Sequence, residues 1–309
     1  MTTYNYADVY GHKMFYREAG DKSAPKLVLL HGFPTSSHMY RNLIPQLADN
    51  LHVIVPDYIG FGYSDAPNAA EFSYTFDNLA AHVEELLFGV LRLKKFSIYV
   101  QDYGAPVGYR IASKHPEAID SIVVQNGNAY VEGIGAAFDP MKPFWANRNK
   151  ETEKPVRGLL SLETTTFQYT HGAKNPKAIS PDNWTFDQVF LDRPGNDAIQ
   201  LDLLHNYSSN VALYDGWHNY FRSSQPRTLI VWGKNDPFFT VEGAKHISEI
   251  YPKLSFTCST PGILRWKKRE TSSPNGSRRF LADRQRRPTG QAFSHVCPVG
   301  RFTLQLTER

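Results

Sequence analysis

The strongest constraint on the fold lies at residues 100–104, where an apolar run meets an acidic residue. Residues 96–100 are mostly apolar, Asp102 follows them, and Gly104 begins a segment with a helical pattern. A sharp turn between a strand and a helix needs glycine, because other backbone must approach it closely. A carboxylate displayed on such a turn can attack a saturated carbon and become an alkyl ester. The alternative is an ordinary helix-capping aspartate.

Length and composition are those of a globular protein with one or two domains. The chain has 309 residues, of which 41% are hydrophobic and 21% are charged, as is usual for globular proteins. No apolar stretch is long enough to span a membrane, and no secretory signal is visible, so a cytoplasmic location is expected. Cys258 and Cys297 provide no disulfide framework.

The net charge of +4 conceals two unlike segments. Residues 254–309 contain eleven Lys/Arg and three Asp/Glu, whereas residues 1–253 contain 23 and 27. The longer segment is therefore mildly acidic and lacks the basic patch that nucleic acids require. We expect a small-molecule substrate and water as partners, without nucleic acid or membrane.

Short apolar runs alternate with helical patterns, which predicts a mostly parallel sheet flanked by helices. Between residues 129 and 226 the apolar runs stop, and helical stretches rich in aromatic residues replace them. An insert in an open sheet is expected to cover the carboxyl ends of the strands, where ligands bind. The predicted divisions are an α/β core of residues 1–128 and 227–253, a cap of residues 129–226, and an atypical basic tail of residues 254–309.

Two more loops follow predicted strands. Residues 31–34 read His-Gly-Phe-Pro, and Asp236 follows a later strand. The backbone amides of Phe33 and Tyr103 can converge on one oxygen as an oxyanion hole. Asp236 can orient a histidine and stabilise its protonated form, although an aspartate before Pro237 is also a common turn residue.

In this order these motifs make residues 8–253 similar to the α/β-hydrolase superfamily. The chain most resembles the branch with an aspartate nucleophile, the haloalkane dehalogenases and epoxide hydrolases. The resemblance implies an α/β-hydrolase fold with a mainly helical cap, Asp102 as nucleophile and Asp236 as triad acid. A His–Asp pair would then activate water against the ester on Asp102, without metal or organic cofactor. The motifs are residues 31–34, residues 57–62 with Ser64 and Asp65, Asp102, and Asp236.

The leaving group separates the two activities of this branch. Its dehalogenases usually bind halide with a Trp after the nucleophile and a Trp or Asn elsewhere, but Tyr103 and Phe33 stand here. Its epoxide hydrolases use cap tyrosines, and Tyr169, Tyr207 and Tyr214 are candidates. Tyr207 and Tyr214 are seven residues apart, so they would share one face of a helix. The balance favours an epoxide, although Tyr103 is atypical of both groups and cap tyrosines can simply pack.

The histidine base has no clear candidate. The family places it in a Gly-His-Phe motif after the acid, and only His246 and His295 follow Asp236. His246 lies in a helical pattern too close to Asp236, and His295, a weak candidate, has no obvious strand-loop context. We therefore expect the chain as written to stop at the ester, or to misfold because its last strand is lost.

Residues 254–277 are suspected to be out of frame. Codons for residues 253–268, read from their third base, permit A-E-L-H-L-L-D-T-G-H-F-A-L-E-E, which contains the missing motif. Residues 271–277 permit D-I-I-A-E-R-I in the same shifted frame. One lost and one gained base would explain Cys258 and part of the basicity. The alternative is a genuine basic tail that binds an acidic partner, and sequencing the gene across codon 253 separates the two.

Two functions outside this chemistry stay open. An ester or lactone hydrolase would favour serine in place of Asp102. A non-catalytic small-molecule binder could use the same capped pocket, since this fold hosts many activities. Covalent labelling of Asp102 distinguishes the binder from the enzyme.

Overall fold

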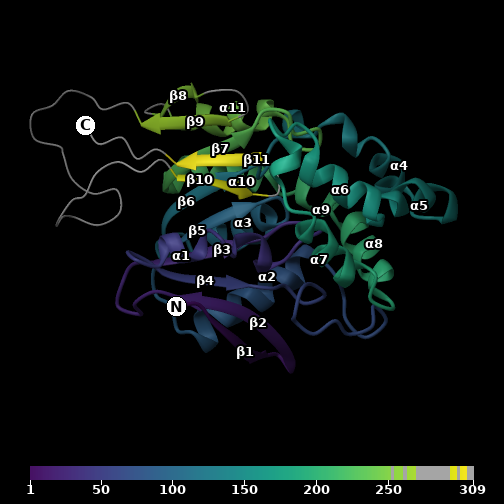
Figure 1. Cartoon of the computed structure of the whole chain (residues 1–309), viewed down its shortest axis with the longest axis horizontal. Coiled ribbons are helices and arrows are strands. Elements are labelled where there is room, and N and C mark those ends of the chain that lie inside the picture. Colours follow the sequence, from purple (N-terminus) through teal and green to yellow (C-terminus); the bar gives the residue numbers. More distant parts are fainter. Residues whose placement is uncertain (252–253, 260–262, 269–292, 298–299, 305–309) are drawn as a thin grey trace, which may run out of the picture.

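A nine-stranded sheet forms the centre of the molecule (Figure 1). The computed structural model describes residues 1–251, 254–259, 263–268, 293–297 and 300–304. The strands of this sheet are β1 (Thr3–Val9), β2 (His12–Ala19), β3 (Lys26–Leu30), β4 (His52–Pro56), β5 (Phe96–Gln101), β6 (Ile119–Gln125), β7 (Arg227–Gly233), β8 (Leu254–Ser259) and β9 (Ile263–Lys268). Their order is β1-β2-β4-β3-β5-β6-β7-β9-β8.

The middle of the sheet is parallel. Strands β4, β3, β5, β6 and β7 pair in parallel, and the strands at either edge are antiparallel. Residues 28–30 of β3 and 53–55 of β4 are fully buried, because helices cover both faces of a parallel sheet and such strands are apolar throughout. The predicted mostly parallel sheet is confirmed.

In the described residues, the segments that build the sheet contribute the α-helices α1 (Ile44–Leu47), α2 (Phe76–Glu85), α3 (Gly104–Lys114) and α11 (Val241–Glu249). Helix α2 begins after Thr75, whose side chain accepts a hydrogen bond from the backbone N–H of Asn78. Helix α3 packs against α2 and against strands β3 and β5. It therefore fixes the turn that joins β5 to α3.

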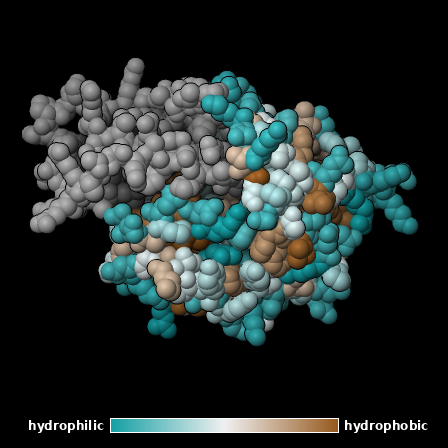
Figure 2. Space-filling model, in the orientation of Figure 1, coloured by the Kyte–Doolittle hydropathy of each residue, from teal (hydrophilic) through white to brown (hydrophobic). Residues whose placement is uncertain are grey.

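Residues 129–226, the predicted inserted cap, contain helices and turns, and none of them lies in a strand. The helices of this segment are α4 (Met141–Ala146), α5 (Lys150–Arg157), α6 (Leu162–Thr170), α7 (Asp182–Leu191), α8 (Asn196–Asn206), α9 (Ser208–Val211) and α10 (Tyr214–Ser224). Helices α4 to α9 gather beyond one end of the sheet (Figure 1), whereas α10 packs on α3. Hydrophobic side chains reach the surface on this side of the molecule (Figure 2), and the exposed ones of the insert include Leu162, Phe167 and Val189.

The last segment is described only in part. Strands β8 and β9 pair antiparallel at the edge beyond β7, and β10 (Phe293–Cys297) pairs with β11 (Gly300–Leu304) in a second sheet. His295 lies in β10 opposite Phe302, a strand of the second sheet and not of the main sheet. The residues between β10 and β11 lie outside the described residues, so the expectation that His295 lacks the family's strand-loop context remains a prediction. Its side chain, those of Cys258 and Cys297, and residues 269–277 lie outside the described residues. The suspected frame change remains a prediction.

Candidate active site

Asp102 occupies the sharp turn between β5 and α3. Its φ of +51° lies in the left-handed region, which costs energy for any residue except glycine. A side chain at Gly104 would place its Cβ 2.2 Å from the carbonyl oxygen of Leu30, and one at Gly32 would place it 2.3 Å from the Cβ of Asp102. Both glycines therefore let the loop after β3 approach the turn.

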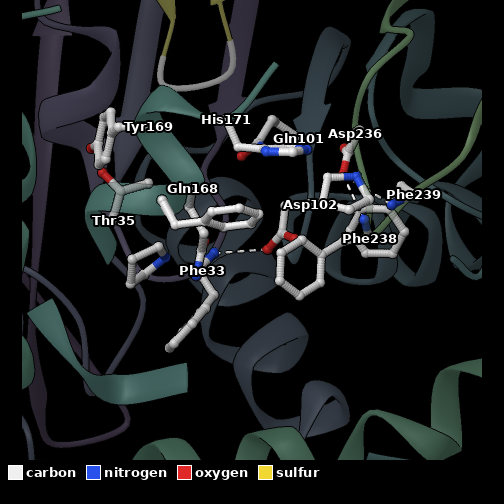
Figure 3. A pocket seen from close by; sticks show the side chains of 13 residues that line it. Phe33, Thr35, Gln101, Asp102, Gln168, Tyr169, His171, Asp236, Phe238 and Phe239 are labelled. Carbon is white, nitrogen blue, oxygen red and sulfur yellow. Dashed lines mark hydrogen bonds between the residues drawn. The ribbon is translucent and has the colours of Figure 1, made fainter. Parts of the chain in front are cut away.

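The carboxylate of Asp102 is held by one of its two oxygens. The backbone N–H groups of Phe33 and Tyr103 donate to Oδ1 at 2.8 and 2.6 Å. Figure 3 shows the bond from Phe33. Among the described residues, none donates a hydrogen bond to Oδ2. Burial raises the pKa of this carboxyl group to about 7; the two amides act against the rise, and the charge of Asp236 adds to it.

Asp236 follows β7 and has both of its oxygens bound. Oδ1 accepts the backbone N–H groups of Phe238 at 2.8 Å and Phe239 at 3.1 Å, and Oδ2 accepts Nδ2 of Asn126 at 2.6 Å. Oδ1 of Asn126 accepts the N–H of Gly233 at 2.9 Å, so Asn126 is fixed to the end of β7. Burial raises the pKa of Asp236, while these three hydrogen bonds lower it.

The carboxylates of Asp102 and Asp236 line one pocket (Figure 3). One wall comes from the loops after β3, β5 and β7, and the other from helix α6 and the residues that follow it. In open α/β sheets, ligands bind beyond the carboxyl ends of the strands, and this pocket has that position. Phe167, which is 41% exposed, is one of its lining residues, so the pocket reaches the surface there. The lining residues are Phe33, Pro34, Thr35, Gln101, Asp102, Phe167, Gln168, Tyr169, His171, Asp236, Pro237, Phe238 and Phe239.

One of the two histidines that follow Asp236 is described with its side chain, and it lies outside this pocket. His246 pairs with Glu249, with 3.2 Å between Nδ1 and Oε2, and stacks on Tyr130 with ring centroids 5.2 Å apart. The pocket contains His171 instead, a residue of the helical insert. In the described part of the chain no histidine is hydrogen-bonded to Asp102 or Asp236.

The three candidate tyrosines have different surroundings. Tyr169 lines the pocket, but its hydroxyl donates to Asp187 of α7. Thr35 also hydrogen-bonds to Asp187, whose pKa burial raises to about 7 while Tyr169 and Thr35 act against the rise. In Figure 3 the hydroxyl of Tyr169 points toward Thr35 and away from Asp102.

Tyr207 and Tyr214 do not share one helix, so that expectation is wrong. Tyr207 lies between α8 and α9, and Tyr214 begins α10, because the chain turns twice between them. Their hydroxyl groups nevertheless hydrogen-bond to each other, and Tyr214 accepts Nδ2 of Asn128 at 3.2 Å. Tyr207 is buried with its ring centroid 6.1 Å from that of Tyr103, and neither tyrosine is part of the pocket lining.

Several site residues carried no signal strong enough to single them out. Asn126 directly follows β6 at the edge of the sheet where ligands bind, and this position could have marked it. His171 and Asp187 lie in the insert, where no motif or strand end points to them. Within the described residues, no group of His, Cys, Asp and Glu side chains is placed to hold a metal ion, and no helix is long and apolar enough to cross a membrane.

Residues 25–262 match the family described as alpha/beta hydrolase fold, which is most of the chain. The chain belongs to this hydrolase family. A relative described as an uncharacterised hydrolase of Saccharomyces cerevisiae is 41% identical over 239 residues, which are 76% of this chain and 81% of the yeast protein. A haloalkane dehalogenase of Mycobacterium marinum is 43% identical over 119 residues, but these span only 38% of its length and 37% of this chain.

Solved structures show the same fold at lower sequence identity. A haloalkane dehalogenase of Bradyrhizobium elkani superposes with a TM-score of 0.63 at 20% identity, over 81% of this chain and 87% of that one. An epoxide hydrolase superposes with a TM-score of 0.56 at 24% identity, over 70% of this hydrolase and 77% of that chain. The predicted α/β-hydrolase fold, and the resemblance to this branch of the superfamily, are confirmed.

Proposed function

We propose that this hydrolase opens an epoxide with Asp102 as the nucleophile and forms an alkyl-enzyme ester. The observation that carries the proposal is the unequal use of the two Asp102 oxygens. Oδ1 accepts two backbone N–H groups, whereas Oδ2 accepts no bond from a described residue, and the carboxylate faces a pocket. A carboxylate held in this way keeps its orientation and retains a reactive lone pair.

In the first step Oδ2 attacks a carbon of the epoxide ring, and the bond from that carbon to the ring oxygen breaks. The ring oxygen develops negative charge and must gain a proton. Tyr207 and Tyr214 are the proposed donors, since they form a hydrogen-bonded pair beside Tyr103. Tyr169 is a weaker candidate because its hydroxyl is bonded to Asp187. The substrate must bring its oxygen to the pair, or the pair must turn toward the pocket.

In the second step water attacks Cγ of Asp102. The carbonyl oxygen of the ester is then Oδ1, which already accepts the amides of Phe33 and Tyr103 at 2.8 and 2.6 Å. Donors set in place before charge develops stabilise a tetrahedral intermediate without further reorganisation. The bond from Cγ to the alkyl oxygen breaks, a diol leaves, and the carboxylate keeps one oxygen from water.

A base for the water is the incomplete part of this site. We propose that Asp236 orients a histidine, as the resemblance implies, yet in the described part of the chain Asp236 bonds only to Asn126 and two backbone amides. Without an oriented base, ester hydrolysis loses about 10²–10⁴-fold in rate. The ester of this chain should therefore form faster than it breaks down, and the hydrolase should be impaired in turnover.

Intact mass spectrometry tests the proposal. The protein is incubated with styrene oxide and, separately, with 1-bromobutane, and its mass is followed over time. We expect a gain equal to the whole epoxide, because ring opening loses no atoms. A protein that stays unmodified by both reagents, while its fold is intact, would contradict covalent catalysis and favour a non-catalytic binder.

A haloalkane is the second candidate substrate. The local similarity to the Mycobacterium marinum dehalogenase favours it, whereas the side chains of Phe33 and Tyr103 lack the N–H donors that dehalogenases of this branch usually provide. With 1-bromobutane the mass gain would be a butyl group less one proton, with release of bromide. Faster labelling by this reagent than by the epoxide would select the dehalogenase activity.

A further inference from the structure

The pocket contains one histidine whose role nothing above explains. In the part of the chain that the structure describes, His171 is the only histidine among the pocket-lining residues, and it shares that lining with Asp102 and Asp236. In Figure 3 its side chain lies toward the part of the pocket that holds Asp102 and Asp236, rather than toward Thr35. A positive charge on this imidazole would lower the pKa of Asp236, so the two groups interact electrostatically.

Local contacts hold His171 at this position. Its ring stacks on Phe167, one turn earlier in the chain, with centroids 4.4 Å apart and planes inclined by 26°. The next residue, Gly172, accepts Nδ2 of Asn235 at 3.1 Å. Gly172 has a φ of +70°, and a Cβ there would lie 2.6 Å from the Cβ of Asn235. The loop after α6 is thus docked on the residue that precedes Asp236.

We propose that His171 is the base that hydrolyses the Asp102 ester in this chain, an inference that rests on the proposed function. Its imidazole takes a proton from water as the water oxygen bonds to Cγ of Asp102. The bond from Cγ to the alkyl oxygen then breaks, and the departing alkoxide takes the proton back from the imidazolium. One water is consumed, one diol is released, and Asp102 returns to its acid form, which loses its proton to solvent.

The same geometry makes His171 a slow base. It is exposed, and Asp236 does not reach it with a hydrogen bond, so the imidazolium gains little of the stabilisation that an oriented carboxylate provides. The ester therefore accumulates, as the proposed function requires, and then decays at a rate set by His171. Formation of the ester does not involve this residue.

Single-turnover mass spectrometry of the full chain separates the two steps. The protein is labelled with styrene oxide, excess reagent is removed, and the decay of the adduct is followed in the unaltered protein, in His171→Gln and in His246→Gln. His246 is the matched control, because it lies after the acid but outside the pocket. We expect formation rates within about twofold of each other, and decay slowed roughly tenfold or more in His171→Gln alone.

Chemical rescue distinguishes a proton-transfer role from a structural one. In His171→Ala, added imidazole should restore adduct decay in proportion to its concentration, and it should leave His246→Gln unchanged. The inference is overturned if His171→Gln decays like the unaltered protein, or if imidazole has no effect. It is also overturned if ester formation slows as much as ester decay, because His171 would then act on the leaving oxygen in the first step. An unaltered protein that acquires no adduct refutes the proposed function, and this inference with it.

Discussion

Asp102 and Asp236 follow strands β5 and β7, line the same pocket, and each accepts two backbone N–H groups. They differ in the second oxygen: Oδ2 of Asp236 accepts Asn126 at 2.6 Å, whereas Oδ2 of Asp102 is free of bonds from the described residues. A carboxylate with both oxygens bound can orient a neighbour, and one with a free oxygen can attack. We propose that this contrast gives two residues of the same type different chemical roles.

The loops that carry Asp102 and Asp236 also hold these carboxylates by different means. The Asp102 turn depends on missing side chains at Gly32 and Gly104, which let the neighbouring loop approach and donate its amide. The Asp236 loop depends on an added side chain, that of Asn126, whose own φ of +42° is in the left-handed region. Substitutions in the Asp102 turn and in the Asp236 loop should therefore have different effects on the protein.

The largest effect on ester formation is expected from replacing Asp102, whose Oδ2 accepts no bond from the described residues. Asp102→Asn should slow ester formation by about a thousandfold or more, because an amide is a poor nucleophile and lost nucleophiles cost rates of this order. Asp236→Asn is the matched control and should still be labelled, since Asp236 is assigned only to ester breakdown. Intact mass after incubation with an epoxide measures both. Equal loss of labelling in the two variants would remove the distinction between them.

The second largest effect is expected at Gly32, where the loop after β3 approaches the Asp102 turn closely. Gly32→Ala places a Cβ 2.3 Å from the Cβ of Asp102, so the Phe33 amide must move away from Oδ1. We expect decay of the labelled ester to slow by roughly 10²-fold, the order of cost seen when one donor to a tetrahedral intermediate is lost. Gly216→Ala in α10 is the control, because nothing lies within 4 Å of the added methyl group. It should leave ester decay unchanged; slower decay there too would indicate general disruption.

The third prediction uses the pKa of Asp102. Burial raises it to about 7, so the carboxylate is the minor form below that pH. Labelling should rise about tenfold between pH 5 and pH 6 and level off above pH 7. Because the charge of Asp236 adds to this pKa, Asp236→Asn should move the midpoint to lower pH. Stopped-time mass spectrometry across pH 5–9 measures both curves, and a flat profile would contradict the assignment.

The smallest effect on labelling is expected from Asn126→Ala. It removes a donor from Asp236 and an acceptor from the N–H of Gly233, and unpaired groups of this kind cost about 1–3 kcal/mol each. The free energy of unfolding should fall, while labelling stays within about threefold. Chemical denaturation measures the free energy of unfolding, and intact mass spectrometry measures labelling. A large loss of labelling would mean that Asp236 also positions Asp102.

The core could be predicted closely because its signals are local. Residues 27–30 and 53–56 are continuous apolar runs, and they lie within β3 and β4. The turn at Asp102 was predictable since Gly104 is needed where α3 meets β3. The roles of Asp102 and Asp236, the cap function of the insert and its division from the core remain predictions.

The rest of the pocket depends on tertiary contacts that no periodicity records. Tyr207 and Tyr214 meet through a helix–turn–helix rather than along one helix face. His171 enters the pocket because the following glycine docks on Asn235. Neither contact leaves a repeat or a motif in the sequence, so the pocket wall contributed by the insert could not be derived from it.

The central claim is that Oδ2 of Asp102 forms a bond to carbon. Tandem mass spectrometry of the proteolytic peptide containing residue 102, after incubation with styrene oxide, tests it most directly. The account predicts a mass gain of one whole epoxide located on Asp102 and absent from Asp102→Asn. An adduct located on Asp236 or His171 instead, or a folded protein without any adduct, would contradict it.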